Sequence, residues 1–320
     1  MLRRIPLWVT LVPLALAIGV YWLFWSSWAK DFGAVVERVL PVNDVAVTGF
    51  PYRLEAALTK PVWMAGDGVK IVARADKALV NRGPWQTQLT VIRAEYPAFS
   101  AVVGPGFGAS FTGKSAVTSL RIEGGMLARL STIVEAAKAR LGFLPVAIVA
   151  DTLEMHLRER FPTMEKSESA TLPPRGQLVL KGERLRFDGG DALTFFADMT
   201  ANGGARLTNF DNWAHAGTIE VSALTLADAH GVVAKLAATV VPLGRTGLRF
   251  AGTLETVCPA TVVAAFAGVV PATELRLRVP VRLAFDGLAG GIKLSGMPED
   301  VAMRARRGQD PACPVLRGPG

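Results

Sequence analysis

The longest uncharged stretch of the chain lies at its N-terminus, where Ile5 to Ala29 contain no charged residue. A helix of about 20 residues crosses the hydrocarbon core of a bilayer, so this stretch is long enough to span a membrane. Near one end lies Trp8, and near the other are the rings that favour a membrane–water interface, Tyr21, Trp22, Trp25 and Trp28. The pattern predicts one transmembrane helix, within an anchor segment of residues 1–30.

The flanking charges predict the orientation of this helix. Arg3 and Arg4 precede it, whereas Lys30 and Asp31 follow it and cancel. The positive-inside rule then keeps the N-terminus in the cytoplasm and exports residues 30–320. The alternative is a cleaved signal peptide ending at the small-x-small triplet 27–29, although the apolar run exceeds the roughly 7–15 residues of a signal core. Both interpretations export the body of the protein.

The hydrophobic period then changes from helical to alternating. Residues 30–42 predict a short separate helix that Pro41 ends. Beyond it apolar residues alternate with polar ones around Gly, Pro and Asn turns, which indicates half-buried strands over much of residues 45–99 and 177–285. One amphipathic helix is expected from Met126 to Leu141, where Leu130, Ile133 and Ala137 keep helical spacing. The predicted fold is mainly β, with extended antiparallel sheets and one intervening helix behind the transmembrane helix.

Composition changes along the chain suggest domain boundaries. Residues 162–176 are polar and contain prolines, so we interpret them as a linker between a first β-rich half, 31–161, and a second, 177–298. The halves have similar composition, which hints at a duplicated unit. Residues 299–320 are basic and rich in Gly and Pro, and we expect a flexible tail.

The clearest alternation occurs in the run ELRLRVPVRLAF, residues 274–285. The side chains that would share its apolar face, and that we take as candidates for lipid contact, are Leu275, Leu277, Val279, Val281, Leu283 and Phe285. The opposite face carries Glu274, Arg276, Arg278 and Arg282, which we expect in solvent. Pro280 fits an edge strand or a bulge.

Composition narrows the function classes. Half of the residues are hydrophobic and the mean hydropathy is +0.32, which excludes a disordered chain. Thirty-two glycines and 20 prolines argue against a helical bundle. The net charge of +8 suits a surface near anionic lipid or nucleic acid and does not choose between them. With three histidines and no metal-binding motif, we expect no metal and no cofactor.

The two cysteines, Cys258 and Cys313, both lie in the exported part, where oxidation is permitted. A bridge between them would hold the tail on the sheet, and the chain-entropy model values such a loop at about 4 kcal/mol. The alternative is a buried thiol at 258 and a loose one at 313.

One segment fits a phosphate-loop pattern. Residues Gly108 to Ser115 match G-x-x-x-x-G-K-[ST], with Lys114 at the lysine position. That chemistry needs a helix directly after the lysine, because the helix N-terminus binds the phosphates. The residues that follow are β-branched and alternate with a period of two, so we expect a strand and no bound nucleotide. Cytoplasmic localisation of this segment would revive the nucleotide hypothesis.

The hexapeptide GFPYRL after the N-terminal anchor resembles an uncharacterised bacterial envelope family, domain of unknown function 2125. The motif residues are Gly49, Phe50, Pro51, Tyr52 and Arg53. The resemblance implies that they join two strands of an extended sheet. On physical grounds, we expect the Phe50 and Tyr52 rings to be buried beside the bend. The family has no established activity, so it implies no catalytic residues. The layout also resembles AsmA-like envelope proteins, whose extended sheets cradle lipid acyl chains.

These observations predict a non-enzymatic protein of the bacterial inner membrane that faces the periplasm. The expected partners are membrane lipid and other envelope proteins, with no nucleic acid. The alternative is a structural or interaction module whose sheets simply pack together. A phosphate-loop enzyme is the remote third class.

Overall fold

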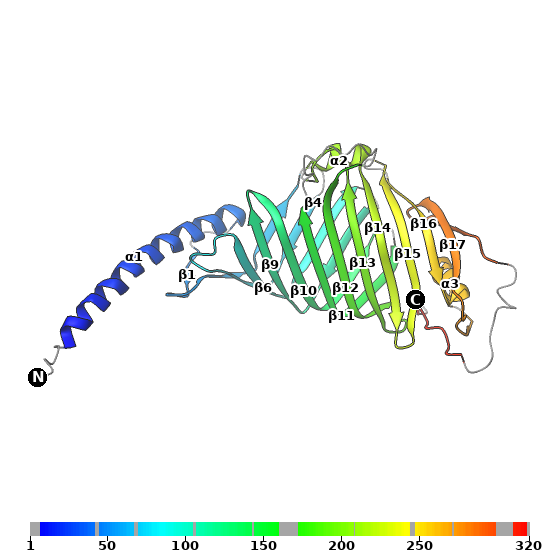
Figure 1. Cartoon of the computed structure of the whole chain (residues 1–320), viewed down its shortest axis with the longest axis horizontal. Coiled ribbons are helices and arrows are strands. Elements are labelled where there is room, and N and C mark those ends of the chain that lie inside the picture. The colour runs from blue at the N-terminus through cyan, green and yellow to red at the C-terminus, as the bar shows by residue number, and fades with distance from the viewer. Residues whose placement is uncertain are drawn as a thin grey trace, which may run out of the picture.

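The computed structural model describes residues 7–41, 45–66, 70–104, 107–142, 144–159, 172–207, 209–243, 247–270, 272–298 and 310–318. Arg3 and Arg4, most of the predicted linker and residues 299–309 and 319–320 of the predicted tail lie outside these residues. The described strands form one antiparallel sheet of 18 strands, which confirms the mainly β fold. The molecule is elongated, with an N-terminal helix projecting from one end of the sheet (Figure 1).

The N-terminal helix α1 (Leu7–Val39) is continuous, so the predicted anchor and the predicted juxtamembrane helix are one element. Its first part is exposed along Leu11–Val20. Its last part buries a stripe against the sheet, formed by Trp25, Ala29, Phe32 and Val36. This spacing of three to four residues keeps one face on the sheet, and the helix therefore continues without a break. It is long and apolar enough to cross a membrane.

Strands from the first part of the chain alternate between the two sides of a bend. They are β1 (Val47–Thr48), β2 (Leu54–Thr59), β3 (Val62–Ala65), β4 (Lys70–Arg74), β5 (Lys77–Arg82), β6 (Leu89–Glu95), β7 (Ala98–Gly104), β8 (Phe107–Thr112) and β9 (Ser115–Glu123). One side has the order β1-β2-β5-β6-β9 and the other has β3-β4-β7-β8. Both sides join the long strand β10 (Met126–Leu141), through β9 and through β8.

The bend is a crease that crosses the strands. Lys60, Tyr96 and Ala136 have positive φ there. Backbone hydrogen bonds continue across the sheet along the crease, for example from Tyr96 N to Lys114 O and from Lys114 N to Glu135 O. The eight strands β2–β9 are therefore four bent strand pairs, which join the rest of the sheet through β10, and β1 extends the β2 side.

The prediction of a helix over Met126–Leu141 is wrong, because this segment is strand β10. Its inward positions are Thr132 and Val134 before the crease and Ala137 after it. Positive φ at Ala136 shifts the alternation by one residue. Two stretches of period two joined by that shift imitate the three-to-four spacing of a helix.

From β10 onward the strands follow each other as a meander. They are β11 (Leu144–Glu159), β12 (Pro174–Phe187), β13 (Leu193–Asn202), β14 (Thr218–Asp228), β15 (Gly231–Pro242), β16 (Leu248–Thr256), β17 (Val281–Leu288) and β18 (Lys293–Ser295). β11 pairs with β12 from Ile148 to Glu159, so the two predicted halves share a single sheet. Strand β12 already begins inside the predicted linker.

Two further helices, neither of them predicted, accompany the meander: α2 (Phe210–Ala216) and α3 (Pro259–Ala267). The carboxylate of Glu274 accepts hydrogen bonds from the backbone N–H groups of Ala260 (3.1 Å) and Thr261 (2.7 Å) at the start of α3. These amides have no partner within the helix, so a buried acidic residue from another segment satisfies them.

The described end of the predicted tail, residues 310–318, is packed on the sheet and is called the strap below. Cys313 forms a disulfide with Cys258, with 5.8 Å between their Cα atoms. Leu316 is buried in the core beside α3. At its far end the strap reaches the β12–β13 hairpin, where Arg317 Nε donates to Asp188 Oδ2 at 2.8 Å. The strap thus connects the α3 region with a hairpin about 125 residues earlier in the chain.

Candidate functional site

The face of the sheet on which α1 and α3 pack is called the inner face. Residues directly opposite each other on neighbouring strands share a face, so the pairing traces rows across it. The central row is Ala56, Val80, Ile92, Thr118, Thr132, Met155, Leu180, Ala197, Leu224, Leu236, Leu254 and Leu283. No charged residue occurs in this row over twelve strands.

The rows on either side are also apolar, with Arg82 as their one charged residue. One is Leu58, Ala78, Ala94, Ala116, Val134, Leu153, Gly182, Phe195, Leu226, Ala234, Thr256 and Val281; the other is Leu54, Arg82, Thr90, Leu120, Leu130, Leu157, Leu178, Met199, Val221, Ala238, Gly252 and Phe285. Beyond the crease the inner face continues with Trp63, Ala73, Phe99, Phe111, Ala139, Ile148 and Phe187.

The outer face is mixed over the same strands, where charged residues alternate with apolar ones such as Val117, Ile133 and Phe196. A neighbouring row there contains Arg93, Glu154, Lys181, Lys235, Glu255 and Arg282. His156 also belongs to this face, where its Nδ1 lies 3.0 Å from Ser131 Oγ and its Nε2 lies 3.5 Å from a Glu154 carboxylate oxygen. It is half-buried. The asymmetry between the faces identifies the inner face as the candidate site.

Different parts of the inner face have different cover. At one end α1 packs on β2 and β5, around Leu54 and Ala56. At the other end α3 and the strap pack on β13–β17, around Leu254 and Leu283. Between them, the third row on β9–β11 belongs to a separate buried cluster around Ala116 and Val134. In the other two rows on β9–β12, Thr132 is buried, and the remaining side chains are half-buried and belong to none of the three clusters, namely Thr118, Leu120, Leu130, Met155, Leu157, Leu178 and Leu180. Among the described residues, this middle stretch is apolar surface without a helix on it.

The six predicted lipid-facing residues do not form one open face. Leu277, Val281, Leu283 and Phe285 are buried in the cluster beside α3, with Leu283 1% exposed. Val279 is 66% exposed, and Leu275 forms an isolated bridge with Ala312 of the strap. The run is not one strand, because β17 begins only at Val281.

The prediction that Glu274 and Arg276 lie in solvent is wrong, because both are buried. Glu274 holds the start of α3, and Arg276 forms an ion pair with Asp228 at the end of β14. Segment 274–277 lies between the sheet and the strap, with backbone hydrogen bonds to Val257 on one side and to Pro311 on the other. Because the strap covers this segment, its polar side chains are removed from water. Arg278 and Arg282 are exposed as expected.

The GFPYR motif joins β1 to β2 and contacts helix α1. Gly49 has φ +100°, and a Cβ there would lie 2.9 Å from Arg53 O. The Tyr21 hydroxyl donates to Pro51 O at 2.5 Å, and Trp25 Nε1 donates to Arg53 O at 3.0 Å. The motif therefore attaches the sheet at the level of the helix's aromatic residues.

An aromatic group forms around this attachment. The Phe50 ring lies 5.8 Å from that of Tyr21 and 5.5 Å from that of Trp25, and Trp85 lies 6.2 Å from Tyr21. Phe50 remains 41% exposed and Tyr52 74% exposed, so the expected burial of both rings is wrong. Exposed rings around a membrane helix are typical of the membrane–water interface.

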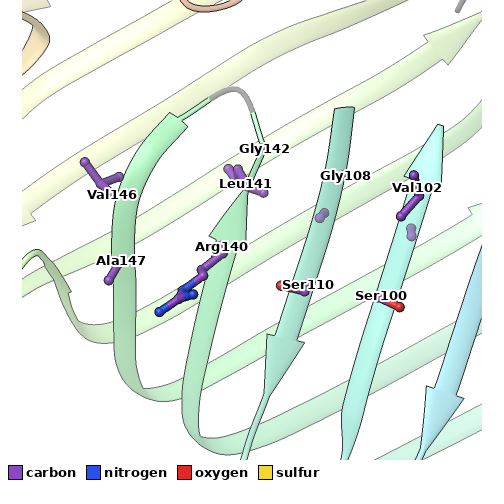
Figure 2. A pocket seen from close by; sticks show the side chains of 11 residues that line it. Ser100, Val102, Gly108, Ser110, Arg140, Leu141, Gly142, Val146 and Ala147 are labelled. Carbon is purple, nitrogen blue, oxygen red and sulfur yellow. The ribbon is translucent and has the colours of Figure 1, made fainter. Parts of the chain in front are cut away.

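A hollow of about 570 Å³ lies at the ends of β7, β8, β10 and β11 (Figure 2). The hollow exists because the residues that line it on β7 and β8 are small, namely Ala101, Gly108 and Ala109. Arg140 is the charged residue of the lining. Gly108 also starts the phosphate-loop pattern, which spans β8 and the beginning of β9. The strand expected after Lys114 is present, and no helix follows that lysine.

No group of three or more His, Cys, Asp or Glu side chains suited to a metal ion occurs within the part of the chain that the structure describes. The sequence predicted an apolar sheet face, but only over residues 274–285, and did not predict the rows that cross twelve strands. The alignment of these rows depends on pairing that a single strand's pattern does not contain.

The fold and the site define a class of protein: a single large antiparallel sheet with one apolar face, joined to an N-terminal apolar helix long enough to cross a membrane. The chain belongs to the family described as "Uncharacterized protein conserved in bacteria (DUF2125)", which it matches over residues 36–298. The match confirms the resemblance carried by the GFPYR motif. No curated protein and no solved structure matches the chain, so the resemblance to AsmA-like proteins stays a prediction.

Proposed function

We propose that the protein is a non-enzymatic, membrane-anchored component of the bacterial envelope that holds lipid acyl chains on the inner face of its sheet. The observation that carries the proposal is the half-buried apolar stretch on β9–β12, which carries no helix and lies between the end covered by α1 and the end covered by α3. Apolar surface of this kind is unfavourable in water, and each methylene group of an acyl chain that it buries contributes about 0.8 kcal/mol.

The site has direct access to a lipid source if α1 crosses the bilayer. Residues 7–24 precede the part of the helix that packs on the sheet, and at 1.5 Å per residue they extend about 27 Å, close to the hydrocarbon thickness of about 30 Å. The aromatic residues at the attachment would then lie in the headgroup region. The inner face would begin where the helix leaves the membrane.

We place the sheet in the periplasm and the N-terminus in the cytoplasm, with the inner membrane between them. Arg3 and Arg4 support this orientation through the positive-inside rule. The Cys258–Cys313 disulfide also supports it, because disulfides persist in oxidising compartments such as the periplasm. A topology reporter fused after residue 320 tests the placement: activity of a periplasmic reporter is expected, and a signal from a cytoplasmic reporter would contradict it.

Photo-crosslinking in living cells tests lipid contact. A photoreactive phenylalanine analogue would replace Met155 or Leu180 on the inner face of the full chain, in cells labelled with radioactive phosphate. Matched controls would carry it at Val179 or Lys181, which flank Leu180 on β12 and face outward. Labelled phospholipid adducts are expected at the two inner positions only. Adducts at neither inner position, or equal adducts on both faces, would disprove the proposal.

A structural or interaction module remains the second candidate function, and the distal end of the sheet favours it. There the inner face is a closed core beneath α3 and the strap. If the inner positions on β9–β12 crosslink to protein instead of lipid, the interaction module is the better description of the whole face.

A further inference from the structure

Arg82 is the one charged residue in the inner-face rows traced above. It lies at the end of β5, opposite Leu54 on β2 and Thr90 on β6. Every other position in those rows is apolar, Gly or Thr. A cation placed alone on an apolar face is unfavourable unless a partner compensates it.

The surroundings of Arg82 compensate it only in part. Its guanidinium carbon lies 4.9 Å from the centre of the Phe32 ring of α1, a cation–π arrangement. Nη1 donates to Thr87 O over a long 3.4 Å. The buried Nε has no hydrogen-bond partner among the described residues.

The electrostatics agree with this geometry. Burial lowers the pKa of Arg82 from its ordinary value, while the negative charge of Asp31 acts in the opposite direction. Withdrawal from water thus disfavours the cation, and a second anion would stabilise it. A guanidinium is suited to phosphate because its planar fork donates two parallel hydrogen bonds.

The position of Arg82 points to the source of such an anion. The residue lies within the α1-covered end of the inner face, against Phe32, and Trp85, three residues later, contacts Tyr21 of the aromatic group. Arg82 therefore lies at the end of the inner face nearest the membrane helix, with the apolar rows leading away from it.

We propose that Arg82 binds the phosphate of an anionic phospholipid taken from the membrane that α1 crosses, while the acyl chains lie along the apolar rows. This inference rests on the proposed function and adds the headgroup class and the residue that selects it. It requires a preference for phosphatidylglycerol over the zwitterionic phosphatidylethanolamine, because Arg82 already has Asp31 near it and gains most from a ligand with net negative charge.

The test uses the full chain in nanodiscs of equal phosphatidylglycerol and phosphatidylethanolamine, with the photoreactive residue at Thr90, next to Arg82 on the inner face. Mass spectrometry of the adducts gives the ratio of the two lipids. We expect about ten-fold enrichment of phosphatidylglycerol in the wild-type background, which corresponds to a difference of about 1.4 kcal/mol in binding free energy between the two lipids. Arg82→Gln should bring the ratio close to one.

Arg93→Gln is the matched control, because Arg93 lies on the neighbouring strand but faces outward. It should leave the enrichment unchanged. If Arg82→Gln fails to fold, the wild-type background still decides: enrichment at Thr90 but not at the outward-facing Val91 supports the inference, and equal capture of both lipids overturns it. Equal ratios in wild type and Arg82→Gln overturn the role of Arg82 but leave the proposed function intact. Absence of any lipid adduct at Thr90, Met155 and Leu180 overturns both.

Discussion

The two ends of the inner face are covered by different means. At the α1 end a long helix packs an apolar stripe on β2 and β5, centred on Trp25 and Phe32. At the α3 end a nine-residue helix and the strap need a buried carboxylate, a buried ion pair and a disulfide. Short helices are marginal on their own, so the distal cover depends on specific polar and covalent links. The α1 end depends mainly on apolar area.

The largest effect is expected from a charge inside the distal core. Leu283→Asp would bury a carboxylate without a partner and should cost more than about 4 kcal/mol, enough to unfold that end of the sheet. Val279→Asp, four residues earlier and exposed, should change stability by less than about 0.5 kcal/mol. Thermal unfolding of the full chain in detergent measures both. Tolerance of Leu283→Asp would mean that the distal face is open.

At the α1 end, Trp25→Ala should cost about 3 to 5 kcal/mol, because it removes a buried ring and the hydrogen bond to Arg53 O. Trp22→Ala is the control on the same helix, since Trp22 faces away from the sheet and is exposed. Limited proteolysis between α1 and β2 should accelerate only in Trp25→Ala. Equal cleavage of both variants would show that α1 does not hold the sheet.

At the α3 end, the corresponding test removes the buried ion pair between Arg276 and Asp228. Asp228→Ala leaves Arg276 buried without its partner, and we expect a loss of about 3 kcal/mol. The control is Asp286→Ala, because Asp286 pairs with Arg249 in solvent on the outer face. Its loss should be too small to resolve in the same denaturant titration. A comparable loss in both variants would contradict the distinction between buried and exposed pairs.

Removing the disulfide should have a smaller effect. Cys313→Ser is expected to cost about 2 kcal/mol, in the lower part of the usual range, because Leu316 and Arg317 still hold the strap. A melting temperature that falls on reduction of the wild-type chain but not of the variant would confirm the link. Two freely alkylated thiols in protein isolated from the periplasm would contradict it.

The smallest effect is expected at Lys114, whose side chain is exposed where β8 meets β9. Lys114→Ala should change stability by less than about 0.5 kcal/mol. A fluorescent ATP analogue should bind neither the wild type nor the variant. Binding that disappears in the variant would restore the phosphate-loop interpretation.

Much of the fold could be predicted because it depends on local patterns. The N-terminal helix follows from an uncharged run, and the alternation in segments such as 231–241 predicts strands that the structure contains. The helix assigned to Met126–Leu141 failed because one residue with positive φ joins two alternating stretches. Positive φ at an alanine leaves no trace in the pattern of apolar positions.

The site was harder to predict than the elements. The run 274–285 shows strong alternation, yet its apolar side is a closed core because the strap covers it. Arg82 attracts no notice in the sequence, where it is one of several basic residues near a turn. Only the pairing of β5 with β2 and β6 places it on the apolar side. The strap packs so closely on the β12–β13 hairpin that a Cβ at Gly190 would lie 2.5 Å from Val315 O, and this contact has no signal in the sequence.

The rows of the inner face also set how far the apolar surface extends from α1. Strands are spaced about 4.8 Å apart, so the central row from Ala56 on β2 to Leu283 on β17 extends about 50 Å along the long axis of the molecule (Figure 1). This length exceeds the thickness of a bilayer with its headgroups, which is about 40–45 Å. Each successive strand lies about 4.8 Å farther from α1. Under the proposed function, the strand on which a lipid is captured would therefore report the distance of that lipid from α1.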